Sequence, residues 1–287
     1  MFRSDGGRRL GAIRPGHDDL VVELSEPADM LALIDAGADG LARVRSAISS
    51  SKARTHRLNE LELLAPLDNP RGNVIGIGRN YQKHAEETAA AGKAPSPPTI
   101  FTKAITSLTE PYADIEIDPS VSDKIDWEVE LAVVIGRQGK NIKRAEARPH
   151  VFGYTILNDV TMRDIQSNWG GQYFKGKSMD RSAPTGPWIV TSDELTDPQS
   201  LALALRVNGA VKQDGNTRDM IYPVDEVVEW ASIGMTLLPG TIIATGTPDG
   251  VGFARTPPEY LGPGDVMESE VEGIGVLRNK FVTSSRD

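Results

Sequence analysis

In Trp127-Glu-Val-Glu-Leu-Ala-Val-Val-Ile135, two acids interrupt an apolar run that otherwise predicts a buried β-strand. Residues two apart in a strand point to the same face, so Glu128 and Glu130 project together while Val129 and Leu131 pack on the other side. Neighbouring carboxylates at a strand end repel each other and lose hydration, a cost that protonation or a cation relieves. Two readings follow: the solvent face of an edge strand, or part of a cation site.

A third acid stands at the end of a second predicted strand, Val151-Phe-Gly-Tyr-Thr-Ile-Leu157. The segment from 158 to 166 after it resembles a helix entry, which puts Asp159, Arg163 and Gln166 at i, i+4 and i+7 on one polar stripe. A carboxylate, a guanidinium and an amide on one stripe suit a metal together with an anionic ligand. Oxygen ligands favour hard ions such as Mg²⁺, Mn²⁺ or Ca²⁺ over zinc.

Composition describes an ordinary globular chain. It has 287 residues, 39% hydrophobic and 25% charged, with a net charge of -9 and no cysteine. The negative charge argues against nucleic acid or an anionic membrane as a partner, and leaves a small anionic substrate open if cations gather locally. The first residues lack an apolar signal region and no stretch reaches membrane-spanning length, so a cytoplasmic location is the expectation.

Two units are predicted along the chain. Residues 1–70 suggest a small N-terminal domain with a strand at 20–24 and helical stretches near 28–34 and 38–49, and residues 71–287 form the second. The second unit contains short β-rich runs at 74–77, 100–102, 127–135, 151–157, 188–190, 201–207, 241–245 and 275–279. The clearest helix spans 224–235, and 88–98 is a low-complexity surface tract. This pattern favours a mixed β-rich α+β fold over a doubly wound one.

The residues from Gly171 to Ser178 match the phosphate-loop expression letter for letter. That motif requires a buried strand before the loop and a helix after it, whose amides point at phosphate. Here Pro184 and Pro187 follow within a few residues and preclude a helix of useful length, so the match is interpreted as chance.

His84 and Glu87 are three residues apart, so on a helix they are neighbours and the carboxylate can orient the imidazole. The chain has four histidines, and this one is the best placed general base. A surface helix carrying charges for solubility is the other reading. Lys177 is either a solvated loop lysine or a group that stabilises an enolate or oxyanion.

Together these motifs resemble the fumarylacetoacetate hydrolase (FAH) family over about residues 71–283. The resemblance is carried by the segments 78–84, 126–136, 158–164, 176–180, 186–188 and 245–252. It implies an FAH-type β-sandwich roll, usually a homodimer, with a divalent metal, commonly Mg²⁺. In the roles it implies, Glu128, Glu130 and Asp159 hold the metal, His84 with Glu87 activates water, and Lys177 stabilises charge. It also implies that Arg163, Gln166 and Thr247 contact the substrate.

The expected function is hydrolysis of a carbon-carbon bond in a small diketo acid such as an acylpyruvate or a fumarylpyruvate-like compound, because the resemblance includes the His84-Glu87 pair. The family also contains decarboxylases of oxaloacetate-like acids and isomerases of unsaturated diacids, and a shared metal site does not choose among them. Two alternatives of another class are a nucleotide-binding protein that uses 171–178 and a catalytically silent relative that only binds.

Overall fold

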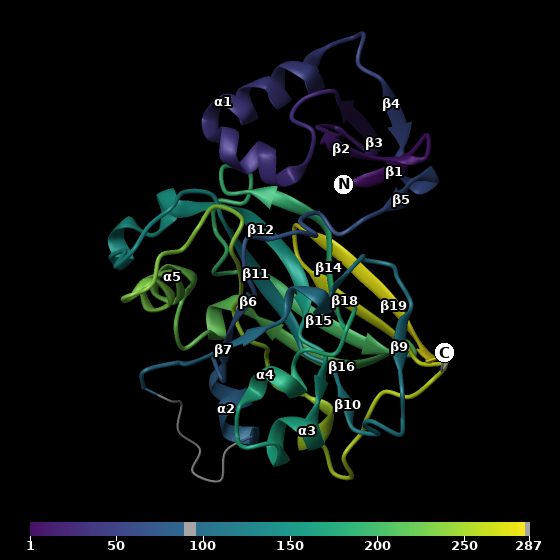
Figure 1. Cartoon of the computed structure of the whole chain (residues 1–287), viewed down its shortest axis with the longest axis vertical. Helices are drawn as coiled ribbons and strands as arrows, with labels where there is room; N and C mark the ends of the chain where they lie inside the picture. The colour runs from purple at the N-terminus through teal and green to yellow at the C-terminus, as the bar shows by residue number, and fades with distance from the viewer. Residues whose placement is uncertain (89–95, 285–287) are drawn as a thin grey trace.

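The computed structural model describes residues 1–88 and 96–284, so most of the low-complexity tract lies outside the described residues. Two stacked sheets form the body of the molecule, and a smaller unit of one sheet and one long helix lies at one end (Figure 1). The described elements are β-rich, with few and mostly short helices. The predicted fold class, a β-rich α+β fold with a β-sandwich roll, is confirmed.

The N-terminal unit is a five-stranded sheet packed against helix α1, Met30–Ser49. In the sheet the order is β4-β3-β2-β1-β5, and the strands are β1 Phe2–Ser4, β2 Gly7–Arg14, β3 His17–Leu24, β4 Thr55–Arg57 and β5 Glu62–Leu63. The two predicted helical stretches are the two halves of α1, interrupted at Gly37, whose φ of 53° is non-helical. Glycine accepts this left-handed geometry without steric cost.

The body consists of a seven-stranded and a five-stranded sheet. The first has the order β7-β6-β17-β11-β12-β14-β8, with β6 Val74–Gly78, β7 Thr99–Lys103, β8 Leu108–Thr109, β11 Val129–Ile135, β12 Val151–Asn158, β14 Ala183–Thr191 and β17 Ile242–Ala244. The second has the order β16-β15-β18-β19-β9, with β9 Ile115–Ile117, β15 Ala202–Val207, β16 Ala210–Asn216, β18 Val266–Val271 and β19 Gly275–Thr283.

Strand β11 is buried on both faces, which explains why its residues other than Glu130 are all apolar. Leu131 and Val133 belong to the core between the two body sheets. Ala132 and Val134 belong to a second core, shared with Leu10, Val22 and other residues of the N-terminal unit. Glu130 has the same parity as Ala132 and Val134, so it lies on the face that this second core covers farther along the strand.

Short helices gather at the end of the body opposite the N-terminal unit (Figure 1). They are α2 Gln82–Thr88, α3 Arg163–Asn168 and α4 Tyr173–Gly176, and beside them the strands β10 Ile125–Asp126 and β13 Thr161–Met162 form a two-stranded sheet. Helix α5, Val224–Ser232, lies apart from these short helices (Figure 1). It buries Val224, Val227, Val228 and Ala231, as predicted. It ends earlier than predicted, and Met235 is exposed.

The predicted strands of the body are all present, within a few residues of their expected ends. The sequence reading missed β8, β9, β16 and β18 of the two body sheets, the short strands β10 and β13, and all strands of the N-terminal unit except β3. Among the described residues, no helix is both long and apolar enough to cross a membrane.

Candidate metal and active site

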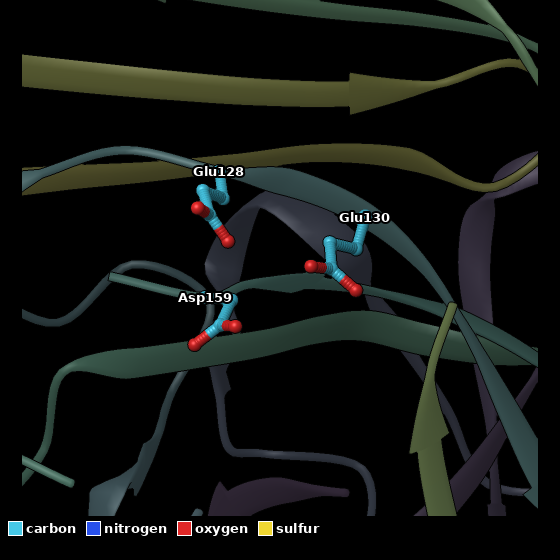
Figure 2. A group of neighbouring side chains, drawn as sticks. All are labelled: Glu128, Glu130 and Asp159. Atoms are coloured by element: carbon cyan, nitrogen blue, oxygen red, sulfur yellow. The ribbon is translucent and has the colours of Figure 1, made fainter. Parts of the chain in front are cut away.

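The carboxylates of Glu128, Glu130 and Asp159 point toward one another at the end of the seven-stranded sheet (Figure 2). Glu128 directly precedes β11 and Asp159 directly follows β12, and the antiparallel register of these strands pairs Val129 with Asn158. The Asp159 amide donates to the Glu128 carbonyl at 2.8 Å, which fixes the two backbones together. One oxygen from each of the three side chains lies within 4.8 Å of the others, and all three residues are buried.

The two lysines at the site compensate part of this negative charge. Lys177 Nζ donates to Glu128 Oε2 and Asp159 Oδ2, each at 2.7 Å. Burial alone lowers the pKa of Lys177, but the two carboxylates outweigh it and raise that pKa above its usual value. Lys103 Nζ lies 2.8 Å from Asp159 Oδ1, and its side chain is fully buried. Burial lowers the pKa of Lys103, and Asp159 only partly offsets this.

Arg163 is a third cation that bonds to the carboxylate cluster, and its own position is fixed by hydrogen bonds. Its Nη2 donates to Glu128 Oε1 at 2.6 Å and its Nη1 to Gln166 Oε1 at 3.1 Å. Its Nε donates to Asp126 Oδ2 at 2.8 Å, and Asp126 also accepts from the amides of Gly252 and Phe253. Asp126 therefore orients the guanidinium and ties it to the segment that follows β17.

Glu128 and Glu130 differ in their electrostatic surroundings. Burial raises the pKa of Glu128, but the charges of Lys177 and Arg163 outweigh it and hold the pKa well below its usual range. Burial, reinforced by the charges of Asp159 and Glu128, raises the pKa of Glu130 well above its usual range. The only hydrogen bond recorded for the Glu130 carboxylate within the described residues comes from the Gly246 amide, at 2.6 Å.

These three side chains fit a hard divalent cation. Three carboxylates offer an all-oxygen donor set, and the Glu130 carboxylate has no protein cation bonded to it within the described residues. Such donors suit Mg²⁺, Mn²⁺ or Ca²⁺.

His84 and Glu87 meet on α2 as the spacing predicted. His84 Nδ1 lies 2.8 Å from Glu87 Oε1, and His84 is 6% exposed. The Glu87 carboxylate also accepts from the Gly250 amide at 3.0 Å, so the pair is anchored to a distant segment. With Nδ1 engaged, Nε2 is the ring nitrogen left for a proton transfer.

A cavity of about 340 Å³ lies against His84, Lys177 and two of the three clustered carboxylates, those of Glu128 and Glu130. The residues that line it include His84, Glu128, Glu130, Arg163, Gln166, Lys177 and Thr247, with Arg79, Phe101 and Phe253 among the others. Thr247 donates to the Val129 carbonyl at 2.9 Å and accepts from Gln213 at 2.8 Å, so its position in the wall is fixed. The volume suits a small molecule.

Two local expectations were wrong. Asp159 does not share a helix with Arg163, because Thr161–Met162 pairs with Ile125–Asp126 as a strand and α3 begins only at Arg163. Arg163 and Gln166 still bond to each other on α3, and Arg163 and Asp159 are linked only indirectly, through Glu128 and Lys177. The reading of Glu128 and Glu130 as a solvent face of an edge strand is also wrong, since β11 is a central strand and both acids are buried.

Residues 171–178 form the four-residue helix α4 and the turn after it, and Lys177 turns inward to the carboxylates. This agrees with the rejection of the phosphate-loop match.

The sequence reading missed three charged residues of this region, Lys103, Asp126 and Arg79. Asp126 was visible as a further acid directly before the quoted strand, and Arg79 as part of the segment 78–84. Lys103 is the last residue of the strand Thr99–Lys103, and none of its neighbours in the sequence indicates that its side chain is buried.

A buried three-carboxylate cluster beside a histidine-glutamate pair, at the end of a β-sandwich roll, defines a candidate metal-dependent enzyme site. The chain belongs to the fumarylacetoacetate hydrolase family: residues 73–282 match the family described as "Fumarylacetoacetate (FAA) hydrolase C-terminal".

Similar proteins carry several activity names. The mitochondrial oxaloacetate tautomerase FAHD2A of Bos taurus is 40% identical over 282 residues, which cover 96% of this chain and 88% of that protein. The solved fumarylacetoacetate hydrolase from psychrophilic Exiguobacterium antarcticum is 38% identical, with a TM-score of 0.85 over 99% of this chain and 98% of that one. The 5-carboxymethyl-2-hydroxymuconate delta-isomerase from Mycobacterium smegmatis is 34% identical, with a TM-score of 0.78 over 99% and 98%.

Proposed function

We propose that this protein catalyses enolisation of a small 2-keto acid, interconverting its keto and enol forms with the help of a divalent metal. The observation that carries the proposal is the common cavity of His84, Lys177, Glu128 and Glu130, with Asp159 directly beside the two glutamates. Proton transfer at the carbon next to a ketone requires one base and a means to stabilise the enolate, and these groups supply both. The tautomerase named among the relatives supports the same reading.

Each residue then has a role. Glu128, Glu130 and Asp159 would hold the metal, with Mg²⁺ the first candidate and Mn²⁺ or Ca²⁺ also suited. When bound, the cation polarises the 2-keto group and stabilises developing negative charge on its oxygen. His84 takes the proton from C3 and delivers a proton to the enolate oxygen, which gives the enol, and the reverse steps regenerate the ketone. Glu87 keeps Nδ1 engaged so that Nε2 performs both transfers. Lys177 adds positive charge beside the oxyanion, while Arg163, Gln166 and Thr247 position the substrate.

Hydrolysis of an acylpyruvate is the second candidate. In it the His84-Glu87 pair deprotonates a water that attacks the distal carbonyl, the carbon-carbon bond breaks, and the pyruvate enolate leaves. The solved relative named as a fumarylacetoacetate hydrolase supports this reading. Decarboxylation of a keto diacid requires only that the enolate be stabilised, so it is the outcome least dependent on His84.

The deciding experiment gives the purified protein with Mg²⁺ two substrates, oxaloacetate and an acylpyruvate, and follows products by NMR in D₂O. Enolisation predicts exchange of the C3 protons for deuterium in both compounds, above the uncatalysed rate and without bond cleavage. Acylpyruvate cleavage faster than this exchange would replace the proposal with the hydrolase. Formation of pyruvate from oxaloacetate at the exchange rate would replace it with the decarboxylase.

The homodimer and the cytoplasmic location stay predictions. Light scattering after size-exclusion chromatography tests the first. For the second, one relative named above is mitochondrial, so the location is to be determined in the source cells.

A further inference from the structure

Arg79 is an arginine with a backbone conformation that arginine rarely adopts. Its φ is 54°, in the left-handed region. Among the described residues, five non-glycine residues have positive φ, and three of them are Asp or Asn, which tolerate this region. The other two are Arg79 and Arg181, so their conformation calls for an explanation other than residue preference.

The neighbouring Asn80 holds this conformation in place. Its Nδ2 donates to the carbonyls of Tyr222 and Thr245, at 3.0 and 2.8 Å, and its Oδ1 accepts from the Tyr222 amide at 2.8 Å. Its backbone carbonyl accepts from the Ile221 amide at 2.7 Å. Asn80 is fully buried, so the chain at this point is fixed from several sides. The turn after β6 therefore keeps Arg79 at the wall of the cavity.

The cationic side chains that line the cavity differ in how many hydrogen bonds they make to other protein groups. Arg163 is bonded to Asp126, Glu128 and Gln166, and Lys177 to Glu128 and Asp159. Within the part of the chain that the structure describes, no hydrogen bond or ion pair is recorded for the Arg79 side chain, and its Nε is buried without a partner. A guanidinium has five donors in a planar fork that matches a carboxylate. Arg79 is thus the lining cation with unused capacity for an anion.

We propose that Arg79 binds the second, distal carboxylate of the substrate, so that the enzyme acts on keto diacids in preference to keto monoacids. The inference rests on the proposed function, in which the carboxylate and keto group at the other end of the substrate lie at the metal site. A monoacid leaves the Arg79 fork unpaired in a partly buried wall, which disfavours its binding. A diacid pairs with it through charge-assisted hydrogen bonds.

Two nonreactive ligands of equal chain length isolate the distal group. Malate and 2-hydroxybutyrate share the C1 carboxylate and the 2-hydroxyl, and differ in having a carboxylate or a methyl group at C4. Calorimetry in the presence of Mg²⁺ measures the affinity of each for the wild type and for Arg79→Gly, a variant whose glycine accepts the positive φ without strain. Arg79→Gly is expected to weaken malate about 10- to 100-fold and 2-hydroxybutyrate less than about threefold.

Arg181→Gly is the matched control, because Arg181 also has a φ of 54° but is exposed and pairs with Glu110. It is expected to bind both ligands as the wild type does. Arg79→Lys keeps the charge without the fork, and is expected to fall between the wild type and Arg79→Gly for malate. The melting temperature of each variant shows that it is folded, and Arg79→Gly should match or exceed the wild type.

The substrate pair oxaloacetate and 2-ketobutyrate repeats the comparison with reactive compounds, read as C3 exchange in D₂O. Equal weakening of both ligands by Arg79→Gly, or no weakening of malate, overturns the role of Arg79. If the wild type exchanges neither substrate, the proposed function fails. In that case the malate and 2-hydroxybutyrate affinities still decide the carboxylate site by themselves.

Discussion

Lys177 Nζ lies 2.7 Å from Asp159 Oδ2 and bonds equally closely to Glu128. One ammonium thus bridges two of the three proposed metal ligands, and Lys103 supports Asp159 from its other oxygen. Glu130 has no such partner among the described residues. The three acids should therefore respond differently to neutralisation, although all are proposed to bind the same ion.

Glu130→Gln is expected to lose metal affinity while its stability in EDTA holds or rises. The change removes a buried carboxylate that no cation neutralises, and the amide oxygen can still accept from Gly246. Glu128→Gln and Asp159→Asn should lose metal affinity too, but cost about 1 to 3 kcal/mol of stability because buried cations lose a charged partner. Urea unfolding in EDTA and metal calorimetry measure both effects. Equal stability losses in all three variants would contradict this ordering.

Lys103→Met is expected to destabilise the protein by about 3 to 5 kcal/mol in EDTA. Removing this ammonium leaves part of the Asp159 carboxylate buried without its ion pair, along with the carbonyls of Val160 and Lys177. Added Mg²⁺ should restore part of the loss if Asp159 is a ligand. The control is Lys124→Met, since Lys124 is exposed. A loss for Lys103→Met no larger than for the control would mean that Lys103 carries no structural charge.

His84→Ala is expected to slow C3 exchange of oxaloacetate by about 10² to 10⁴-fold, the usual contribution of a general acid-base group. Glu87→Gln should slow exchange less, because the glutamine side-chain oxygen can still accept from His84 Nδ1 and from the Gly250 amide, which both bond to Glu87 in the wild type. Metal affinity should stay at the wild-type value in both. An unchanged exchange rate in His84→Ala would remove this histidine from the reaction.

Asp126→Asn tests the support of Arg163. Asp126 is fully buried and does not line the cavity, but its Oδ2 accepts a hydrogen bond from Arg163 Nε and so orients the Arg163 guanidinium. The variant is expected to raise the KM for a keto acid about tenfold while kcat falls less, because positioning of the bound substrate suffers first. Metal affinity should be unaffected. A fall in kcat alone would place Asp126 in the chemical step instead.

The sequence predicted which side chains meet at the site better than it predicted the local secondary structure around them. Alternation along 127–135 placed Glu128 and Glu130 on one face, and the i, i+3 spacing of His84 and Glu87 predicted their contact. The helix proposed for 158–166 was wrong, because its first residues pair with β10, and a pairing between segments 36 residues apart leaves no local signal. Burial of Lys103 is equally invisible, since it arises from groups at Asp159 and Lys177.

The second apolar core joins the N-terminal unit to β11 and β12. The N-terminal unit therefore covers apolar surface of the body. The family match begins at residue 73, and a chain trimmed to that point would lose Leu10, Val22, Leu33 and the other N-terminal residues of this core, so part of the apolar surface that they cover would meet water. An uncovered apolar sheet face of this kind favours self-association. We therefore expect a chain limited to the family match, residues 73–282, to associate with itself, and the chain that includes the N-terminal unit to stay dispersed. Expression vectors should carry the longer stretch.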